Sequence, residues 1–165
     1  MIILGIHDGH NASASLIING KLVCAIGEER LSRDKHQYGF PAKAIKTVLK
    51  SANISINEID RVAMATATLP PAYFYTSRNS TFTIKDYWKE QREYWYPKLY
   101  EGKDPKYTDI FKHRVDFENF PYDKSFIKNE KDHEGMWKAR LDHVCKTLNI
   151  DKEKVKVYDH HDCHA

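Results

Sequence analysis

Histidine, aspartate and asparagine gather in two short stretches, one near each end of the chain. The first is His7-Asp8-Gly9-His10-Asn11-Ala12-Ser13, between two apolar runs. An imidazole titrates near neutral pH, so we interpret His10 as a general base. For substrate binding, Asp8 can hold a hydroxyl, Gly9 lets the backbone approach a ligand, and Asn11 can donate to phosphate oxygens. The alternative is a polar hairpin loop that only caps strand ends.

The second stretch closes the chain as Asp159-His160-His161-Asp162-Cys163-His164-Ala165. His160 and His164 are four residues apart, so both imidazoles lie on one face and can bind one ion if a helix begins here. A catalytic site needs a third protein ligand, for which Asp162 is one candidate and a residue beyond Ala165 the favoured one. The alternative is a solvated histidine-rich end.

A charged stretch between these two runs from Gly27 to His36 as Gly-Glu-Glu-Arg-Leu-Ser-Arg-Asp-Lys-His, with Phe40-Pro41 after it. We interpret it as a strand end followed by a charged loop, whose exposed ion pairs contribute little to stability. The functional alternative is that Arg33 and Lys35 contact an anionic substrate.

The elements that position these stretches are typical of an α/β fold. Apolar, β-branched runs predict strands over residues 1–6, 12–18, 21–29, 59–66 and 154–158. Asn19-Gly20 predicts a type I′ turn between the second and third strands, because both residues tolerate positive φ. Pro41 suits the first turn of a helix that stops at Asn53. The sequence therefore predicts a mixed sheet opened by a β-hairpin.

An aromatic-rich segment from Ala67 to about Asp132 separates these elements from the end of the chain. It lacks strand alternation, so we expect an insertion with one or two helices, centred on Ile84 to Tyr96. Packing is the favoured role for its aromatic side chains. A last helix is predicted by a stripe of Trp137, Leu141, Val144, Cys145 and Leu148.

Composition limits the class of protein. The chain has 165 residues, of which 41% are hydrophobic, so it can form a domain with a sizeable core. A net charge of +3 gives no case for nucleic acid. The cysteine count of 3 is odd and indicates reduced thiols rather than a disulfide framework. His7 and Asp8 interrupt the first apolar run, which argues against a secretory signal or membrane span, so we expect a cytoplasmic protein without a membrane partner.

Together the three polar stretches resemble the O-carbamoyltransferases of antibiotic and nodulation-factor biosynthesis, in order and in style of spacing. The resemblance implies an enzyme that takes carbamoyl phosphate and ATP as substrates and makes a carbamoyl-adenylate. It then transfers the carbamoyl group to a substrate hydroxyl. A YrdC-like domain makes the adenylate, and an N-terminal domain of the actin/Hsp70/sugar-kinase fold performs the transfer at a metal site.

Carried over residue by residue, the resemblance implies that His10 is the catalytic histidine and Lys35 an anion contact. His160 and His164 become ligands of a divalent metal, iron with zinc as the alternative, completed by an aspartate that this chain lacks. Residues 1–165 then form the N-terminal part of the transfer domain. The rest of that domain and the YrdC-like domain are absent, so we expect the chain alone to be inactive.

Two other functions compete with carbamoyl transfer. A kinase of the same fold would hold ATP phosphates with its first hairpin and would need no metal-binding histidine pair. A non-catalytic binding module would instead recognise a partner through the aromatic insertion, and would require one exposed patch of Tyr87, Trp88, Tyr94 and Trp95.

Overall fold

The structure is a computed structural model that describes residues 1–66, 69–78 and 80–164, without the side chain of His164. The chain divides into two compact units. Unit 1 consists of residues 1–68 and 141–165, and unit 2 of residues 69–140. The two units are described separately below.

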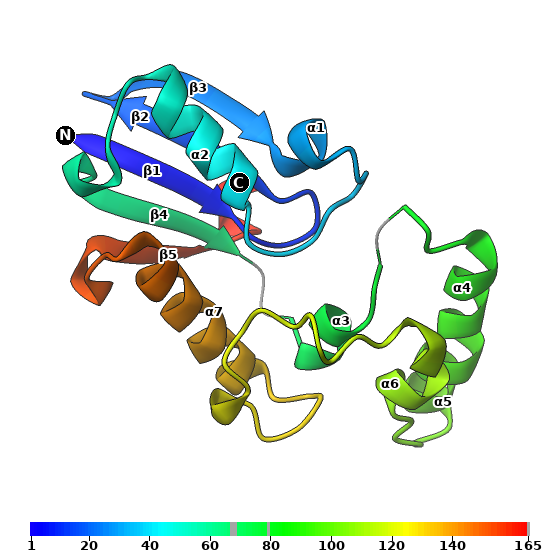
Figure 1. The fold of residues 1–165 in the computed structure, drawn as a ribbon. Helices are drawn as coiled ribbons and strands as arrows, with labels where there is room; N and C mark the ends of the chain where they lie inside the picture. Colours follow the sequence, from blue (N-terminus) through cyan, green and yellow to red (C-terminus); the bar gives the residue numbers. More distant parts are fainter. Residues whose placement is uncertain (67–68, 79, 165) are drawn as a thin grey trace. The chain divides into compact units, whose positions relative to one another are not determined.

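Unit 1 contains the mixed sheet that the sequence predicts (Figure 1). Its strands are β1 (Ile2–His7), β2 (Ser13–Ile18), β3 (Lys21–Gly27), β4 (Arg61–Thr66) and β5 (Val155–Asp159), in the spatial order β3-β2-β1-β4-β5. The first three strands pair antiparallel, whereas β4 is parallel to β1 and β5 is parallel to β4. Asn19 and Gly20 have φ values of 49° and 79°, as the predicted hairpin turn requires.

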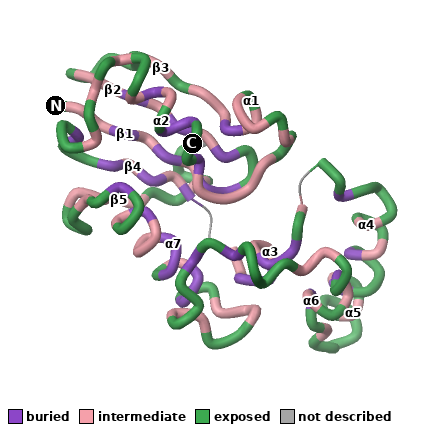
Figure 2. The backbone as a smooth tube through the Cα atoms, viewed as in Figure 1, coloured by how far each residue is buried: buried purple, intermediate pink, exposed green. Residues whose placement is uncertain are grey.

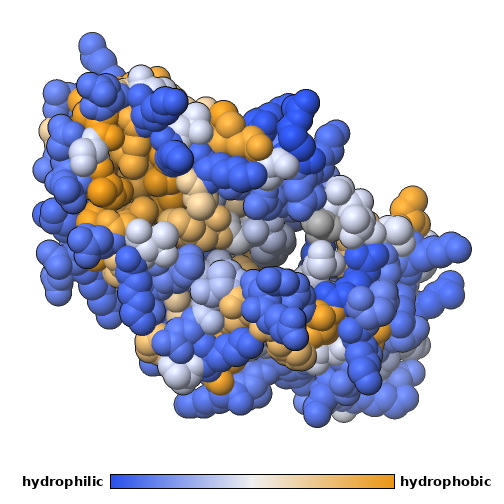
Figure 3. All heavy atoms as spheres, viewed as in Figure 1, coloured by the Kyte–Doolittle hydropathy of each residue, from blue (hydrophilic) through white to orange (hydrophobic). Residues whose placement is uncertain are grey.

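One face of the sheet carries the core of unit 1. Alternate residues such as Leu4 and Met64 point to this face and are fully buried (Figure 2). Helix α2 (Ala42–Ser51) packs on them through Ala44, Ile45 and Val48, and the C-terminal half of α7 (His133–Leu148) through Val144 and Leu148. Apolar side chains accordingly gather over α2 and the neighbouring strands in the upper left of Figure 3.

The opposite face of the sheet carries small side chains and an open hollow of about 540 Å³, lined among others by Gly5, Ser13 and Ser15. Unit 1 also contains short helical segments before, between or after its strands and helices. They are α1 (Glu28–Ser32), η1 (Ile56–Glu58), η5 (Lys152–Lys154) and η6 (Asp162–His164). The prediction that the third strand continues to Glu29 was wrong, because residues 28–32 form α1; the predicted charged loop is present only from Arg33 to His36. The strand ends at Gly27 because the buried Glu28 carboxylate turns to bond the first amides of α2, and helix α1 begins there.

Unit 2 is helical within its described residues. Its elements are α3 (Pro71–Tyr75), α4 (Ile84–Lys89), the π-helical η2 (Glu90–Trp95), α5 (Tyr96–Tyr100), α6 (Tyr107–Ile110), η3 (Lys112–Arg114) and η4 (Lys124–Phe126). The helix predicted over Ile84 to Tyr96 is confirmed and continues to Tyr100. The expected start of the insertion, at Ala67, lies outside the described residues.

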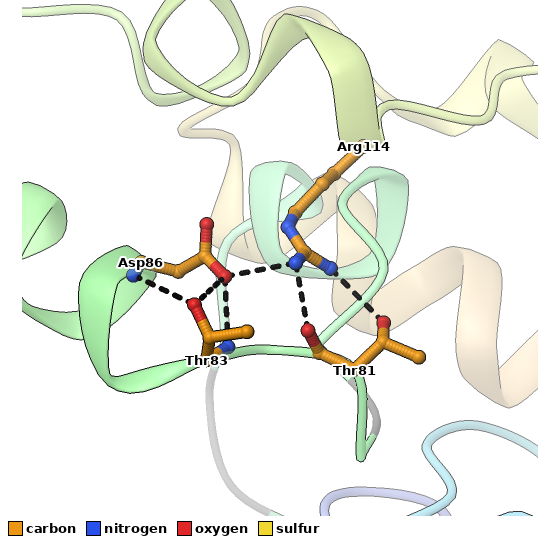
Figure 4. Close-up of polar contacts among 4 residues, drawn as sticks. All are labelled: Thr81, Thr83, Asp86 and Arg114. Atoms are coloured by element: carbon orange, nitrogen blue, oxygen red, sulfur yellow. Dashed lines mark hydrogen bonds and ion pairs between the residues drawn. The ribbon is translucent and has the colours of Figure 1, made fainter.

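An ion pair fixes the start of α4 (Figure 4). Asp86 accepts hydrogen bonds at 2.7 Å from both the backbone nitrogen and the hydroxyl of Thr83, and Arg114 Nη2 lies 2.8 Å from the same carboxylate oxygen. Arg114 also donates to the carbonyl of Thr81 at 2.7 Å. Burial raises the pKa of Asp86, but the bonds from Thr83 and the charge of Arg114 outweigh it and hold this pKa below its usual value.

Aromatic side chains do not form the exposed patch that a binding module requires. Tyr87 and Trp88 are 49% and 59% exposed, but Tyr94 is 4% exposed and packs on Tyr107 in a small core of unit 2.

The predicted last helix is present as α7. Its buried face differs in part from the predicted stripe, because Trp137 is half-buried and the residue before it, Met136, is fully buried. Over the described parts of the chain, no helix has the length and apolar character to cross a membrane.

Candidate active site

The parallel strands of unit 1 bring the first polar stretch, after β1, and the last polar stretch, after β5, to the same edge of the sheet. Strands β1, β4 and β5 run in the same direction, so their last residues, His7, Thr66 and Asp159, lie at one edge of the sheet. The backbone nitrogen of His160 donates to the carbonyl of Thr66 at 3.1 Å and continues the ladder beyond β5. Ligands of open α/β sheets bind outside the carboxyl ends of such strands. We therefore locate the candidate site at this edge.

His7 connects four segments at the edge. Its Nδ1 lies 2.8 Å from the carbonyl oxygen of Ala65 in β4, and its Nε2 lies 2.9 Å from the carbonyl oxygen of His10 in the following loop. The same ring stacks on His160, with centroids 5.0 Å apart and planes inclined by 25°. His7 thereby joins the first polar stretch to the last.

The loop after β1 folds closely over the His7 ring. Gly9 is buried, and a Cβ atom at this position would lie 3.0 Å from Cε1 of His7. A larger residue would push the ring away. Asn11 has a φ of 62°, a left-handed conformation that asparagine tolerates better than most residues. These two residue types let the chain turn sharply while His10 stays exposed.

His10 contacts a second histidine that comes from the loop after α1. The rings of His10 and His36 are stacked, with centroids 5.1 Å apart and planes inclined by 16°. Tyr38 meets the His10 ring edge-on at 5.9 Å. His36 Nδ1 lies 3.1 Å from Oδ1 of Asn11, the residue next to His10. The edge of the sheet thus carries an imidazole that is accessible to solvent and packed against two aromatic neighbours.

Two adjacent glutamates hold the loop that carries His36. Glu28 is 2% exposed and accepts from the backbone nitrogens of Lys43 and Ala44 at 3.1 and 2.6 Å, at the start of α2. Glu29 accepts from the backbone nitrogen of His36 at 3.0 Å. This hydrogen bond is the main reason why the pKa of Glu29 lies below its usual value. Two residues of the predicted charged loop are therefore bound to backbone amides, Glu28 to those at the start of α2 and Glu29 to that of His36.

The predicted metal ligands are described only in part. His160 lies in a turn after β5, and the chain then forms the 3-10 helix η6, so the α-helical face expected to carry His160 and His164 is absent from the described backbone. The side chain of His164 lies outside the described residues. Nearby, the backbone nitrogen of His161 donates to Asp159 at 2.7 Å and lowers the pKa of that carboxyl. No three histidine, cysteine, aspartate or glutamate side chains among the described residues form a group that could hold a metal, so these residues do not by themselves fit a metal site.

The other predicted site residues divide between the edge and its surroundings. Asn11 lies in contact with His36, whereas Asp8 is 1% exposed and faces inward. Lys35 is exposed on the loop beside His36. Sequence reasoning assigned no role to His7, His36 or Tyr38. His7 lies three residues before His10, so its proximity in the sequence was a signal, whereas His36 lies in the later charged stretch and meets His10 only through the fold.

Comparison with known proteins identifies the class of protein that carries this site. Residues 2–165 match the family described as the carbamoyltransferase N-terminus, and the chain belongs to this family. The resemblance to O-carbamoyltransferases found in the sequence is thus confirmed.

Relatives share shorter segments with the chain. An uncharacterised protein of Methanocaldococcus jannaschii is 44% identical over 63 residues, which are 38% of this chain and 12% of that protein. The nodulation protein NolNO of Sinorhizobium fredii is 35% identical over 54 residues, 33% of this chain and 8% of that protein. An uncharacterised 19.2 kDa protein of Rhizobium etli is 37% identical over 54 residues, 33% of this chain and 32% of that protein. In each case the match spans a third or less of the relative.

Proposed function

We propose that this chain is the N-terminal part of an O-carbamoyltransferase, which transfers a carbamoyl group to a substrate hydroxyl. The substrates are carbamoyl phosphate and ATP, which form a carbamoyl-adenylate, and the hydroxyl acceptor. The observation that carries the proposal is the exposed His10 at the carboxyl edge of the sheet, in a chain of the carbamoyltransferase family. The spatial order β3-β2-β1-β4-β5 supports the first lobe of an actin/Hsp70/sugar-kinase-like domain as its fold.

In the proposed reaction the acceptor oxygen attacks the carbonyl carbon of the carbamoyl-adenylate. A bond forms between that oxygen and the carbonyl carbon, the bond from this carbon to the phosphate oxygen breaks, and AMP leaves. His10 takes the hydroxyl proton, which typically accelerates such a step by about two to four orders of magnitude. Lys35 contacts the anionic adenylate, and the exposed Asn11 is the polar side chain of the turn after β1 that can donate to it, whereas Asp8 and Gly9 are buried and shape the turn.

A divalent metal, iron or zinc, belongs to the proposal through His160 and His164. If these histidines held such an ion, it would polarise a carbonyl oxygen and neutralise the charge that develops there. His160 lies at the carboxyl ends of the parallel strands, where its ring stacks on that of His7. Further ligands must come from outside the described side chains.

The test uses the full-length gene product with labelled carbamoyl phosphate, ATP and a panel of polyhydroxylated acceptors. We expect a carbamate ester by mass spectrometry, and a rate about two to four orders of magnitude lower in His10→Asn. Adenylate formation, measured without acceptor, should survive this substitution. A phosphorylated acceptor in place of a carbamate would support a kinase instead, and full transfer by His10→Asn would exclude the base.

Residues 1–165 alone should not turn over carbamoyl phosphate and ATP, because the proposal assigns adenylate formation to a separate YrdC-like domain and these residues match the carbamoyltransferase N-terminus. Two of the relatives, the Methanocaldococcus jannaschii protein and NolNO, extend well beyond the segments they share with this chain, which supports this expectation. Turnover by the isolated chain would overturn the assignment of roles.

A further inference from the structure

His36 has no role in the mechanism above, yet its position is fixed by three features. Its backbone nitrogen donates to Glu29 at 3.0 Å, and its Nδ1 lies 3.1 Å from Oδ1 of Asn11. Its φ of 58° lies in the left-handed region, which is unfavourable for residues other than glycine, although histidine adopts it more often than most. Backbone strain of this kind persists where the surrounding contacts over-determine the conformation. The ring is thus held in place by its loop.

The contacts of His36 bear directly on the orientation of His10. An exposed histidine ring rotates among several side-chain conformers. Here one face of the His10 ring lies on His36, at 5.1 Å between centroids, and Tyr38 meets it edge-on at 72°. Neighbours in two different directions limit rotation of the ring about its side-chain bonds.

Asn11 links the two rings to one turn. Its Oδ1 can only accept a hydrogen bond, so a neutral His36 carries its hydrogen on Nδ1. Asn11 follows His10 directly in the chain, so the hydrogen bond between His36 and Asn11 links the loop that carries His36 to the loop that carries His10. Glu29 ties the same loop to helix α1 and thus to the sheet.

We propose that His36 is a positioning residue that holds the imidazole of His10 in the orientation from which it takes the proton of the acceptor hydroxyl. The inference rests on the proposed role of His10 as the base. A general base must lie within hydrogen-bond reach of its proton, and a displacement of about 1 Å can cost about a hundredfold in rate. An oriented ring therefore raises kcat and leaves substrate binding largely unchanged.

The first experiment measures the stack itself, on the 165-residue chain with labelled histidine. The ring current of His36 shifts the NMR signals of the His10 ring protons, and His10→Asn identifies these signals by removing them. We expect His36→Asn to abolish the shift, because asparagine tolerates the left-handed backbone but has no ring. His36→Phe should keep a ring-current shift, and His133→Ala, which removes an exposed histidine of unit 2, should leave the signals unchanged.

The second experiment measures transfer by the full-length gene product. We expect His36→Asn to lower kcat by about tenfold or more with little change in KM. His36→Phe keeps a ring but loses the bond to Asn11, so it should lose less activity than His36→Asn without matching the unchanged protein, and His133→Ala should retain all of it. In the His10→Asn background, His36→Asn should cause no further loss, because a positioning residue has nothing left to position. A general loss of structure would instead lower the rate of both backgrounds.

The two experiments separate the possible failures. Unchanged His10 signals in His36→Asn would show that the rings do not stack in solution and would overturn the inference. So would normal kcat after loss of the stack, or an equal further loss in the His10→Asn background. If His10→Asn itself transfers at the full rate, the proposed function of His10 fails, and His36 has no base to position.

Discussion

Glu28 offers the sharpest test of how the candidate site is held. Its carboxylate is almost completely buried and accepts two hydrogen bonds, from the backbone nitrogens of Lys43 and Ala44 at the start of α2. Pro41, at the N-cap position, provides no side-chain cap. Removing the carboxylate in Glu28→Ala leaves both amides without the partner seen here and removes a negative charge from the positive end of the helix dipole.

The magnitude follows from these two bonds. A hydrogen bond to a charged group contributes about 1.5–3 kcal/mol, and the buried Ala44 amide should lose a value in this range. The Lys43 amide is only partly buried, so water replaces its partner and it should lose about 1 kcal/mol. We expect Glu28→Ala to lower the free energy of unfolding of unit 1 by about 3 kcal/mol. Glu28→Gln keeps one acceptor oxygen, so it should cost about half as much.

The assay must report on unit 1, and tryptophan fluorescence does not. All 3 tryptophans, Trp88, Trp95 and Trp137, lie within residues 69–140 of unit 2. Hydrogen exchange of the α2 amides reports on unit 1 directly and gives its free energy of opening, whereas far-UV circular dichroism during urea unfolding reports on both units together. The matched control is Glu29→Gln, which affects one hydrogen bond of a more exposed carboxylate and should lower the stability clearly less than Glu28→Ala does. A Glu28→Ala protein with unchanged α2 exchange, or a control that costs as much, would refute the reasoning.

Three further outcomes are expected. The folded pKa of Asp86 lies below its unfolded value, so the ionised carboxylate stabilises unit 2 above about pH 4, and this contribution is lost as the pH falls through the lowered pKa. Asp86→Asn should therefore be less stable than the unchanged protein at neutral pH and should lose less stability on acidification. An unchanged acid dependence in urea titrations would contradict the ion pair with Arg114. His10→Asn should leave the urea midpoint of the chain unchanged, since an exposed ring leaves no cavity, and a clear drop would mean that the ring is structural. Zinc titrated calorimetrically into the full-length protein should bind more weakly after His160→Ala or His164→Ala, and equal affinity in both variants would remove these residues from the proposed metal site.

Local patterns predicted most of unit 1. The hairpin follows from Asn19-Gly20 between two apolar runs, and both the pattern and its consequence lie within a few residues. The end of β3 was mispredicted because its cause is distant. Glu28 leaves the strand to reach amides that lie fifteen and sixteen residues later in the chain. A reader of the sequence sees two adjacent charged residues at a strand end, and the default expectation for such residues is solvent.

The candidate site shows the same division between local and distant causes. His10 was recognisable, because its loop is short, polar and placed between two strands. The stack of His7 on His160 was not, since it depends on β4 lying between β1 and β5 in the sheet. Nor was the contact of His10 with His36, which requires that the loop after α1 return to the loop after β1. Residues that meet through strand order need the topology before their proximity can be inferred.

From the contacts at the edge we expect that the exposed histidines can be substituted without loss of stability in the apolar core. His7 bonds to backbone carbonyls, and Glu29 and Asn11 hold His36 through single hydrogen bonds. The apolar core of unit 1 lies on the face covered by α2 and α7, whereas His10 and His36 are exposed. Substituting either exposed ring therefore removes orientation without removing buried apolar area, the main contribution to stability. Glu28 is the exception, because its carboxylate serves the core helix and lies next to the residue that anchors His36. Variants at Glu28 should change stability first, and variants at Glu29 should alter the alignment of the rings at nearly constant stability.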